Sequence, residues 1–122
     1  MGRFSDFLKW FDAFGVDNYD CIVGNPPYVN PHDLDSSTAQ FLKENFITTK
    51  DGVFNIFYAF IEYAIKYLHD SSKLCFIVPN NFLTIKTAKS LRRFLIERKC
   101  FRKLNHIRNI NCLLLVILFF YF

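Results

Sequence analysis

This sequence is poor in glycine and has no closely spaced cysteines. Its four glycines, Gly2, Gly15, Gly24 and Gly52, are spread so widely that no two can share one glycine-rich turn. The four cysteines form neither a CxxC pair nor a cysteine–histidine ligand pattern. A disulfide framework or a zinc site is therefore a weak interpretation, and we expect reduced core thiols in a cytosolic protein. No metal site is predicted.

Acidic residues are nearly absent from the C-terminal part of the chain. Ten of the eleven acids lie at or before Asp70, whereas nine of the fifteen lysines and arginines lie in Lys86–Arg108, where Glu97 is the only acid. The net charge of +4 thus conceals a positive field at one end, which suits a polyanionic partner. The alternative is an ordinary solvated helix face, and charge alone favours that alternative.

No apolar run of the membrane-spanning kind is present. The tail Leu113–Phe122 is continuously apolar, but a spanning helix needs roughly 20 such residues. The N-terminus is polar and amphipathic, so no secretory signal is visible. We therefore expect a cytoplasmic protein without membrane contact, whose apolar tail is a buried strand or an abnormal chain end.

The rest of the chain alternates between helical and strand-like patterns. Apolar residues recur at helical spacing in Phe4–Phe14, Phe57–Leu68 and Thr87–Arg98. Strands are predicted at Tyr19–Val23, Lys73–Val78 and around Phe101–Ile107, a loop at Asn30–Ala39 and a turn at Asp70–Ser72. With 122 residues, 52% of them hydrophobic, the chain has the size of one α/β unit, and its first two strands should be parallel.

One short motif stands where open α/β sheets bind their ligands. Asn25-Pro26-Pro27-Tyr28 follows directly on the strand predicted at Tyr19–Val23, at its carboxyl end. Its two prolines stiffen the backbone and remove donors, which leaves the carbonyls of Asn25 and Pro26 as fixed acceptors. The Asn25 amide oxygen adds a further acceptor, and Tyr28 supplies a flat ring beside them.

These groups suit the methylation of an amine on a heteroaromatic ring. Such an amine is a poor nucleophile because its lone pair is delocalised into the ring. Two acceptors that bind its N–H protons favour a more electron-rich nitrogen and aim it at a methyl group. A ring stacked on the base holds its plane still and contributes about 1–3 kcal/mol. A plain loop stiffener is the alternative, and the strand context favours the functional interpretation.

Beyond this motif, the sequence resembles the adenine-N6 DNA methyltransferases of restriction–modification systems, in particular the branch that includes fused restriction–modification enzymes. The likeness runs through Phe54–Glu62, Lys73–Leu83 and Leu91–Leu95, and it covers most of residues 17–107 in the family's order and spacing. The resemblance implies an α/β fold, a partial Rossmann-like methyltransferase sheet with flanking helices. It also implies S-adenosyl-L-methionine as cofactor and double-stranded DNA with a flipped adenine as partner.

The resemblance further implies roles for the residues of the motif. Asn25 and the Pro26 carbonyl would accept hydrogen bonds from the target amino group, and Pro27 would complete the stiff turn. Tyr28 would stack on the flipped base. Phe60 matches a family aromatic that lies against the cofactor, although its periodicity fits ordinary core packing equally well.

Other positions would serve the DNA. Lys86, Lys89 and Arg93 lie on the outward face of the helix expected at Thr87–Arg98, and we expect them to contact phosphates. The segment Pro79–Phe82 matches a strand-end segment near the site, and no role is assigned to its asparagines.

The sequence also departs from the family. The glycine-rich turn and the acidic residue that hold the cofactor are missing, and their expected place lies before residue 1. The second aromatic that would sandwich the base is also missing, since the pattern dissolves into Asn109–Phe122. We therefore expect residues 1–122 to be the catalytic part of a methyltransferase domain. The cofactor-binding N-terminal half and the target-recognition domain would be absent, or supplied by a complementing chain.

Two alternatives remain open at this point. The same four-residue motif serves enzymes that methylate a glutamine amide in a release factor or an exocyclic amine in ribosomal RNA. The basic segment also permits a non-catalytic nucleic-acid-binding remnant. The segments Phe54–Glu62 and Pro79–Leu83 favour the DNA methyltransferase over the first alternative.

Overall fold

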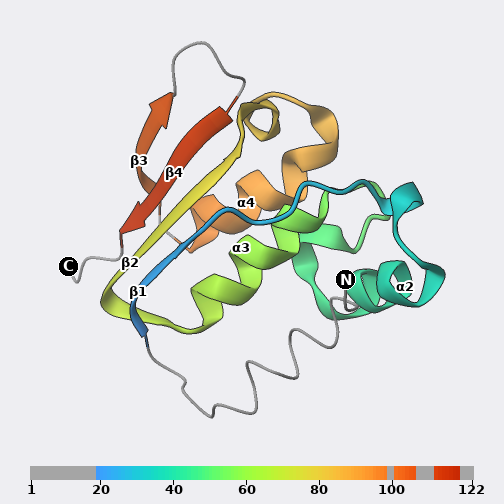
Figure 1. The fold of residues 1–122 in the computed structure, drawn as a ribbon, viewed down its shortest axis with the longest axis horizontal. Coiled ribbons are helices and arrows are strands. Elements are labelled where there is room, and N and C mark those ends of the chain that lie inside the picture. Colours follow the sequence, from blue (N-terminus) through green and yellow to red (C-terminus); the bar gives the residue numbers. More distant parts are fainter. Residues whose placement is uncertain (1–18, 99–100, 107–111, 119–122) are drawn as a thin grey trace.

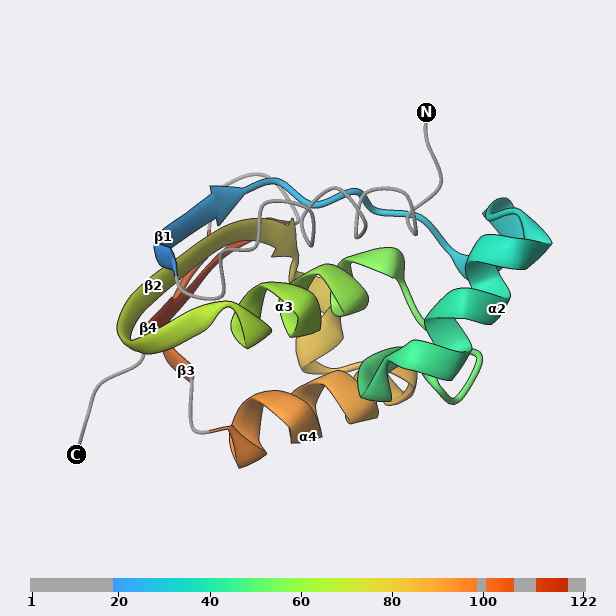
Figure 2. The ribbon, with the colours of Figure 1, turned by 90° about the horizontal axis from the view of Figure 1, so that it is seen from below.

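The fold is a four-stranded sheet with helices against one face. The computed structural model describes residues 19–98, 101–106 and 112–118. The strand order is β1-β2-β4-β3. Figure 2 shows helices α3 (Ile56–Lys66) and α4 (Lys89–Glu97) on the same side of the sheet, with α2 (Ser36–Asn45) beyond its end. The helix predicted at Phe4–Phe14 lies outside the described residues.

Strands β1 (Tyr19–Gly24) and β2 (Leu68–Pro79) are adjacent and parallel, as the sequence predicts (Figure 1). The chain between them contains α2 and then α3, which leads into β2. Helix α3 packs against the sheet, because its apolar surface must be covered. Their register runs from Cys21 opposite Lys73 to Gly24 opposite Phe76. This arrangement confirms the partial methyltransferase-like α/β sheet.

The turn predicted at Asp70–Ser72 is wrong, because these residues belong to β2. The register shifts there, since Tyr19 pairs with Leu68 whereas Cys21 pairs with Lys73. Ser72 is fully buried, and its hydroxyl donates a hydrogen bond to the Tyr19 carbonyl. Ser72 can therefore lie buried in the strand, because the shifted register gives its hydroxyl a partner.

The C-terminal strands extend the sheet. Strand β3 (Phe101–His106) confirms the predicted strand, and β4 (Cys112–Leu118) contains the first part of the apolar tail. Strand β4 lies between β2 and β3 and is antiparallel to both. A continuously apolar sequence suits such a central position. No helix within the described ranges is long and apolar enough to cross a membrane.

The loop predicted at Asn30–Ala39 is also wrong in its second half, because α2 begins at Ser36. Asp35 caps the helix: its carboxylate accepts hydrogen bonds from the Thr38 backbone N–H at 2.9 Å and the Thr38 hydroxyl at 2.6 Å. Hydrogen bonds from Ser37 and Thr38 hold the pKa of Asp35 well below its usual range. Aspartate and serine are common both in loops and at helix N-termini. Here Asp35 and the serines after it form the N-terminus of α2.

The core lies between the helices and β2. Its fully buried side chains come from α2, α3 and α4, from β2 and from the segment after β2, and they include Leu42, Ile61, Leu74, Phe82 and Leu91. On α4, Leu91, Phe94 and Leu95 are buried whereas Lys89 and Arg93 are exposed, as the sequence predicts.

Arg92 joins α4 to the loop that follows β2. Its Nη1 donates hydrogen bonds to the carbonyl oxygens of Phe82 at 2.7 Å and Ile85 at 2.6 Å. Charged donors make strong hydrogen bonds, and these two carbonyls lie beside the buried Phe82 ring. Arg92 therefore holds a loop in place.

Neighbouring arginines offer a matched test of this role. Arg92→Ala should lower the free energy of unfolding by about 1.5–3 kcal/mol, because hydrogen bonds to a charged group are lost. Arg93→Ala, at an exposed position, should change it by less than about 0.5 kcal/mol. Urea unfolding of both variants measures the difference, and equal losses would contradict the assignment.

Candidate functional site

The Asn25–Tyr28 segment begins where β1 ends, at the carboxyl end of a parallel strand. Gly24 closes the strand, and a Cβ placed on it would lie 3.2 Å from Cε1 of Phe76 on β2. A glycine therefore lets the motif leave the sheet close to the buried Phe76 ring. Within the motif, Pro26 is buried whereas Asn25 is exposed.

A cavity of about 240 Å³ lies at this strand end, and we call it the strand-end cavity. Asn25, Pro26 and Pro27 line it together with Phe60 of α3. Its other walls are mainly apolar and aromatic: Ile22, Val23, Tyr63, Ala64, Tyr67 and Phe76. The fold thus brings Phe60 to the motif, while the same ring also packs against the core. Its predicted contact with a cofactor stays a prediction.

Tyr28 faces a different cavity. Its ring is 52% exposed, and it stacks on Phe57 with the ring centroids 6.0 Å apart and the planes at 27°. With Pro79, Asn80 and Asn81 it lines a cavity of about 370 Å³, which we call the tyrosine cavity. The motif is therefore divided: its amide and prolines line one cavity and its ring lines the next.

A third, more polar cavity of about 270 Å³ adjoins Tyr28 and Asn81. Tyr58 lines it, buried to 2% exposure, and its hydroxyl is hydrogen-bonded to the Thr87 side chain. Burial raises the pKa of Tyr58, and the Thr87 hydrogen bond partly opposes that rise. The Tyr58 hydroxyl thus stays protonated at neutral pH.

The three predicted phosphate contacts lie together. Lys86, Lys89 and Arg93 line one cavity of about 430 Å³, which we call the basic groove. Ser90 donates a hydrogen bond to Asp51 Oδ2 at 2.7 Å within it. The groove shares Val53 and Thr87 with the polar cavity beside Tyr28, so the positive charge lies next to the motif.

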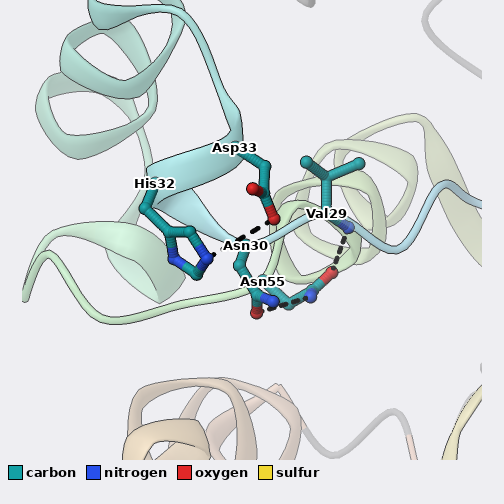
Figure 3. A network of polar contacts seen from close by, with 5 residues as sticks. All are labelled: Val29, Asn30, His32, Asp33 and Asn55. Atoms are coloured by element: carbon teal, nitrogen blue, oxygen red, sulfur yellow. Dashed lines mark hydrogen bonds and ion pairs between the residues drawn. The ribbon is translucent and has the colours of Figure 1, made fainter.

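Asn55 is a site residue that the sequence analysis missed. It is 4% exposed and caps the N-terminus of α3, and it also contacts the chain just after Tyr28 (Figure 3). Its Oδ1 accepts a hydrogen bond from the Val29 N–H at 3.0 Å, and its Nδ2 donates to Asn30 Oδ1 at 3.4 Å. An asparagine directly before an apolar helix is a capping signal that could have identified it.

Comparison with known proteins places the chain in a family. The Eco57I restriction-modification methylase model matches residues 2–112. The chain belongs to this family. The Type II methyltransferase M.HincII of Haemophilus influenzae is 36% identical over an alignment of 102 residues that covers 82% of this chain. The Type II restriction enzyme and methyltransferase RM.Eco57I of Escherichia coli is 35% identical over an alignment of 108 residues that covers 81% of the chain.

A thermophile relative extends the comparison. M.TthHB8I of Thermus thermophilus, a Type II methyltransferase, is 31% identical over an alignment of 100 residues that covers 77% of the chain. The chain spans only part of these family members: 20% of M.HincII, 23% of M.TthHB8I and 11% of RM.Eco57I.

The buried tyrosine beside the motif gives a testable pH dependence. Because its folded pKa is raised, Tyr58 contributes stability that is fully present below the unfolded pKa of about 10 and is lost as pH rises through the folded value. Tyr58→Phe should remove a tyrosinate absorbance step that lies at higher pH than that of an ordinary tyrosine. Thr87→Val should move that step to still higher pH, because the hydrogen bond lowers the pKa. Loss of a step near pH 10 in Tyr58→Phe would contradict this environment.

Proposed function

We propose that this chain is the base-handling part of a site-specific, adenine-N6 DNA methyltransferase that uses S-adenosyl-L-methionine. The observation that carries the proposal is the divided motif. Asn25 and Pro26 line one cavity at the end of β1, and the exposed Tyr28 ring lines the next. A flat base on Tyr28 would direct its amino group toward the acceptors of Asn25 and Pro26.

The residues of the motif would activate the amine as follows. Asn25 Oδ1 and the Pro26 carbonyl each accept a hydrogen bond from one N–H of the adenine amino group. These two bonds favour a pyramidal nitrogen with a localised lone pair. Tyr28 holds the ring plane, and Phe57 supports Tyr28 from below. No general base is required before methyl transfer, because the proton can leave the nitrogen afterwards.

The strand-end cavity fits the cofactor in its chemistry. Its walls are apolar and aromatic, and such a cavity takes a flat heteroaromatic ring. Phe60 would lie against that ring, next to the acceptors of Asn25. S-adenosyl-L-methionine supplies, when bound, the electrophilic methyl group. In this proposal the polar contacts to the rest of the cofactor come from a glycine-rich half outside residues 1–122, in the same protein or in a complementing chain.

The basic groove would carry the DNA. Lys86, Lys89 and Arg93 are exposed and lie in one cavity near Tyr28, which suits the phosphates that flank a flipped adenine. The names of the relatives describe Type II methyltransferases, in agreement with a DNA substrate. The proposed location is the cytoplasm, where such DNA is found.

The motif is best tested in a complete enzyme, made by replacing the matching 102-residue segment of M.HincII with that of this chain. Asn25→Ala removes one preorganised acceptor at the reacting nitrogen. Turnover should fall roughly a hundred- to a thousandfold, with much less change in DNA affinity. Tyr28→Ala should mainly weaken capture of the extrahelical base, by about 1–3 kcal/mol.

Methyl transfer and DNA binding are measured for both variants against the unsubstituted chimera. Near-normal turnover in Asn25→Ala would mean that the motif only stiffens a loop.

The basic groove is tested with the chain itself. Each of Lys86→Gln, Lys89→Gln and Arg93→Gln should weaken duplex binding equally for all sequences. Each should also reduce the slope of log K against log salt by about 1. Fluorescence anisotropy over a salt series measures this slope. Lys73→Gln, an exposed site on β2 that does not line the groove, is the control and should keep the wild-type slope.

A further inference from the structure

Val29, the residue after Tyr28, is hydrogen-bonded through both its backbone N–H and its backbone carbonyl. The Val29 N–H donates to Asn55 Oδ1 at 3.0 Å, and the Val29 carbonyl accepts from the Ile56 N–H at 3.0 Å. Both partners belong to the start of α3, 26 residues further along the chain from Val29 in the first case. Val29 is therefore bound to the start of α3 by two hydrogen bonds, one to a side chain and one to the backbone.

Asn55 does more here than helix capping requires. A cap needs one side-chain acceptor for the second or third backbone N–H of the helix. The Oδ1 of Asn55 lies 3.4 Å from the Phe57 nitrogen but 3.0 Å from that of Val29, so its shorter hydrogen bond is to the motif's neighbour. Its Nδ2 also donates to Asn30, which a serine or aspartate cap could not reproduce (Figure 3).

The same helix turn carries the support for the motif. Phe57, two residues after Asn55, is buried to 1% exposure and stacks on Tyr28. Phe60, one turn further, lines the strand-end cavity. The hydrogen bonds between Val29 and the start of α3 therefore help to fix the position of the Tyr28 ring relative to Phe57 and to the strand-end cavity.

We propose that Asn55 is a positioning residue, which sets the Tyr28 ring in register with α3 so that a base on it reaches Asn25. This inference rests on the proposed function. Its physical basis is that Tyr28 is half exposed and that, among the described residues, its ring stacks only on Phe57, so its position depends on the backbone that follows it. A displacement of about 1 Å is enough to cost a hundredfold in rate at a reacting centre.

Three variants of the 122-residue chain separate positioning from capping. Asn55→Ser keeps a cap oxygen but is too short to reach Val29. Asn55→Asp keeps an oxygen at the Oδ1 position for the Val29 and Phe57 N–H groups and loses only the 3.4 Å donation to Asn30, so it should rescue. Asn45→Ser is the control, because the hydrogen bond that Asn45 makes within the described part of the chain is local: its Nδ2 donates to the Phe41 carbonyl at 2.8 Å. Amide hydrogen exchange at Val29 and Phe57 is measured by NMR, together with the affinity for hexanucleotides that carry one central adenine or thymine.

In Asn55→Ser, the Val29 N–H should exchange about tenfold to a hundredfold faster, because a part-buried donor loses its partner. The Phe57 amide should change far less. Affinity for the adenine hexanucleotide should fall about tenfold, as stacking on Tyr28 is lost. Asn55→Asp and Asn45→Ser should stay near wild type in both measurements.

Unchanged Val29 exchange in Asn55→Ser would overturn the proposal. Faster Val29 exchange with undiminished adenine affinity would also overturn it, because Asn55 would then be merely structural. A wild-type chain that does not prefer adenine would instead count against the proposed function. In that case the exchange rates still decide whether Asn55 holds the loop.

Discussion

The parallel pairing of β1 with β2 is the constraint on which the site depends. It brings the carboxyl ends of two strands to one edge, so that Asn25 follows β1 next to Phe76 and Asn80 follows β2 near Tyr28. The strand-end cavity and the tyrosine cavity are both lined by residues from the two strands or from the segments that follow them. Helix α3 must cross between them, and it therefore places its own aromatic face beneath the motif.

Much of this fold could be predicted from the sequence, because the spacing of its apolar residues indicates which face of each helix is buried. Helix α3 and the inward face of α4 each bury one continuous apolar surface, whereas β1 was predicted from its β-forming residues, none of which is fully buried. Helix α2 was missed because its first turn is polar, and a polar first turn is shared by loops and caps. The bulge near Ser72 was missed because its partner, the Tyr19 carbonyl, is 53 residues away.

The sequence predicted the Asn25–Tyr28 motif as a candidate site, but it predicted neither the division of the motif between two cavities nor the contacts of Asn55. The spacing of the motif indicates acceptors beside a ring, yet only the folded chain separates Asn25 and Tyr28 into neighbouring cavities. Charge shows the same limit. Arg92 and Arg93 are alike in sequence, but Arg92 bonds two carbonyls of its own chain whereas Arg93 lines the basic groove. Periodicity cannot reveal such partners.

The central claim is that an adenine base lies on Tyr28 with its amino group at Asn25. Intermolecular nuclear Overhauser effects test it most directly, with the chain bound to a duplex that carries one unpaired adenine. The account predicts contacts from the H2 and H8 protons of that adenine to the Tyr28 ring, with the amino protons near Asn25. Contacts of that adenine to other residues only, or none to the Asn25–Tyr28 segment, would contradict it.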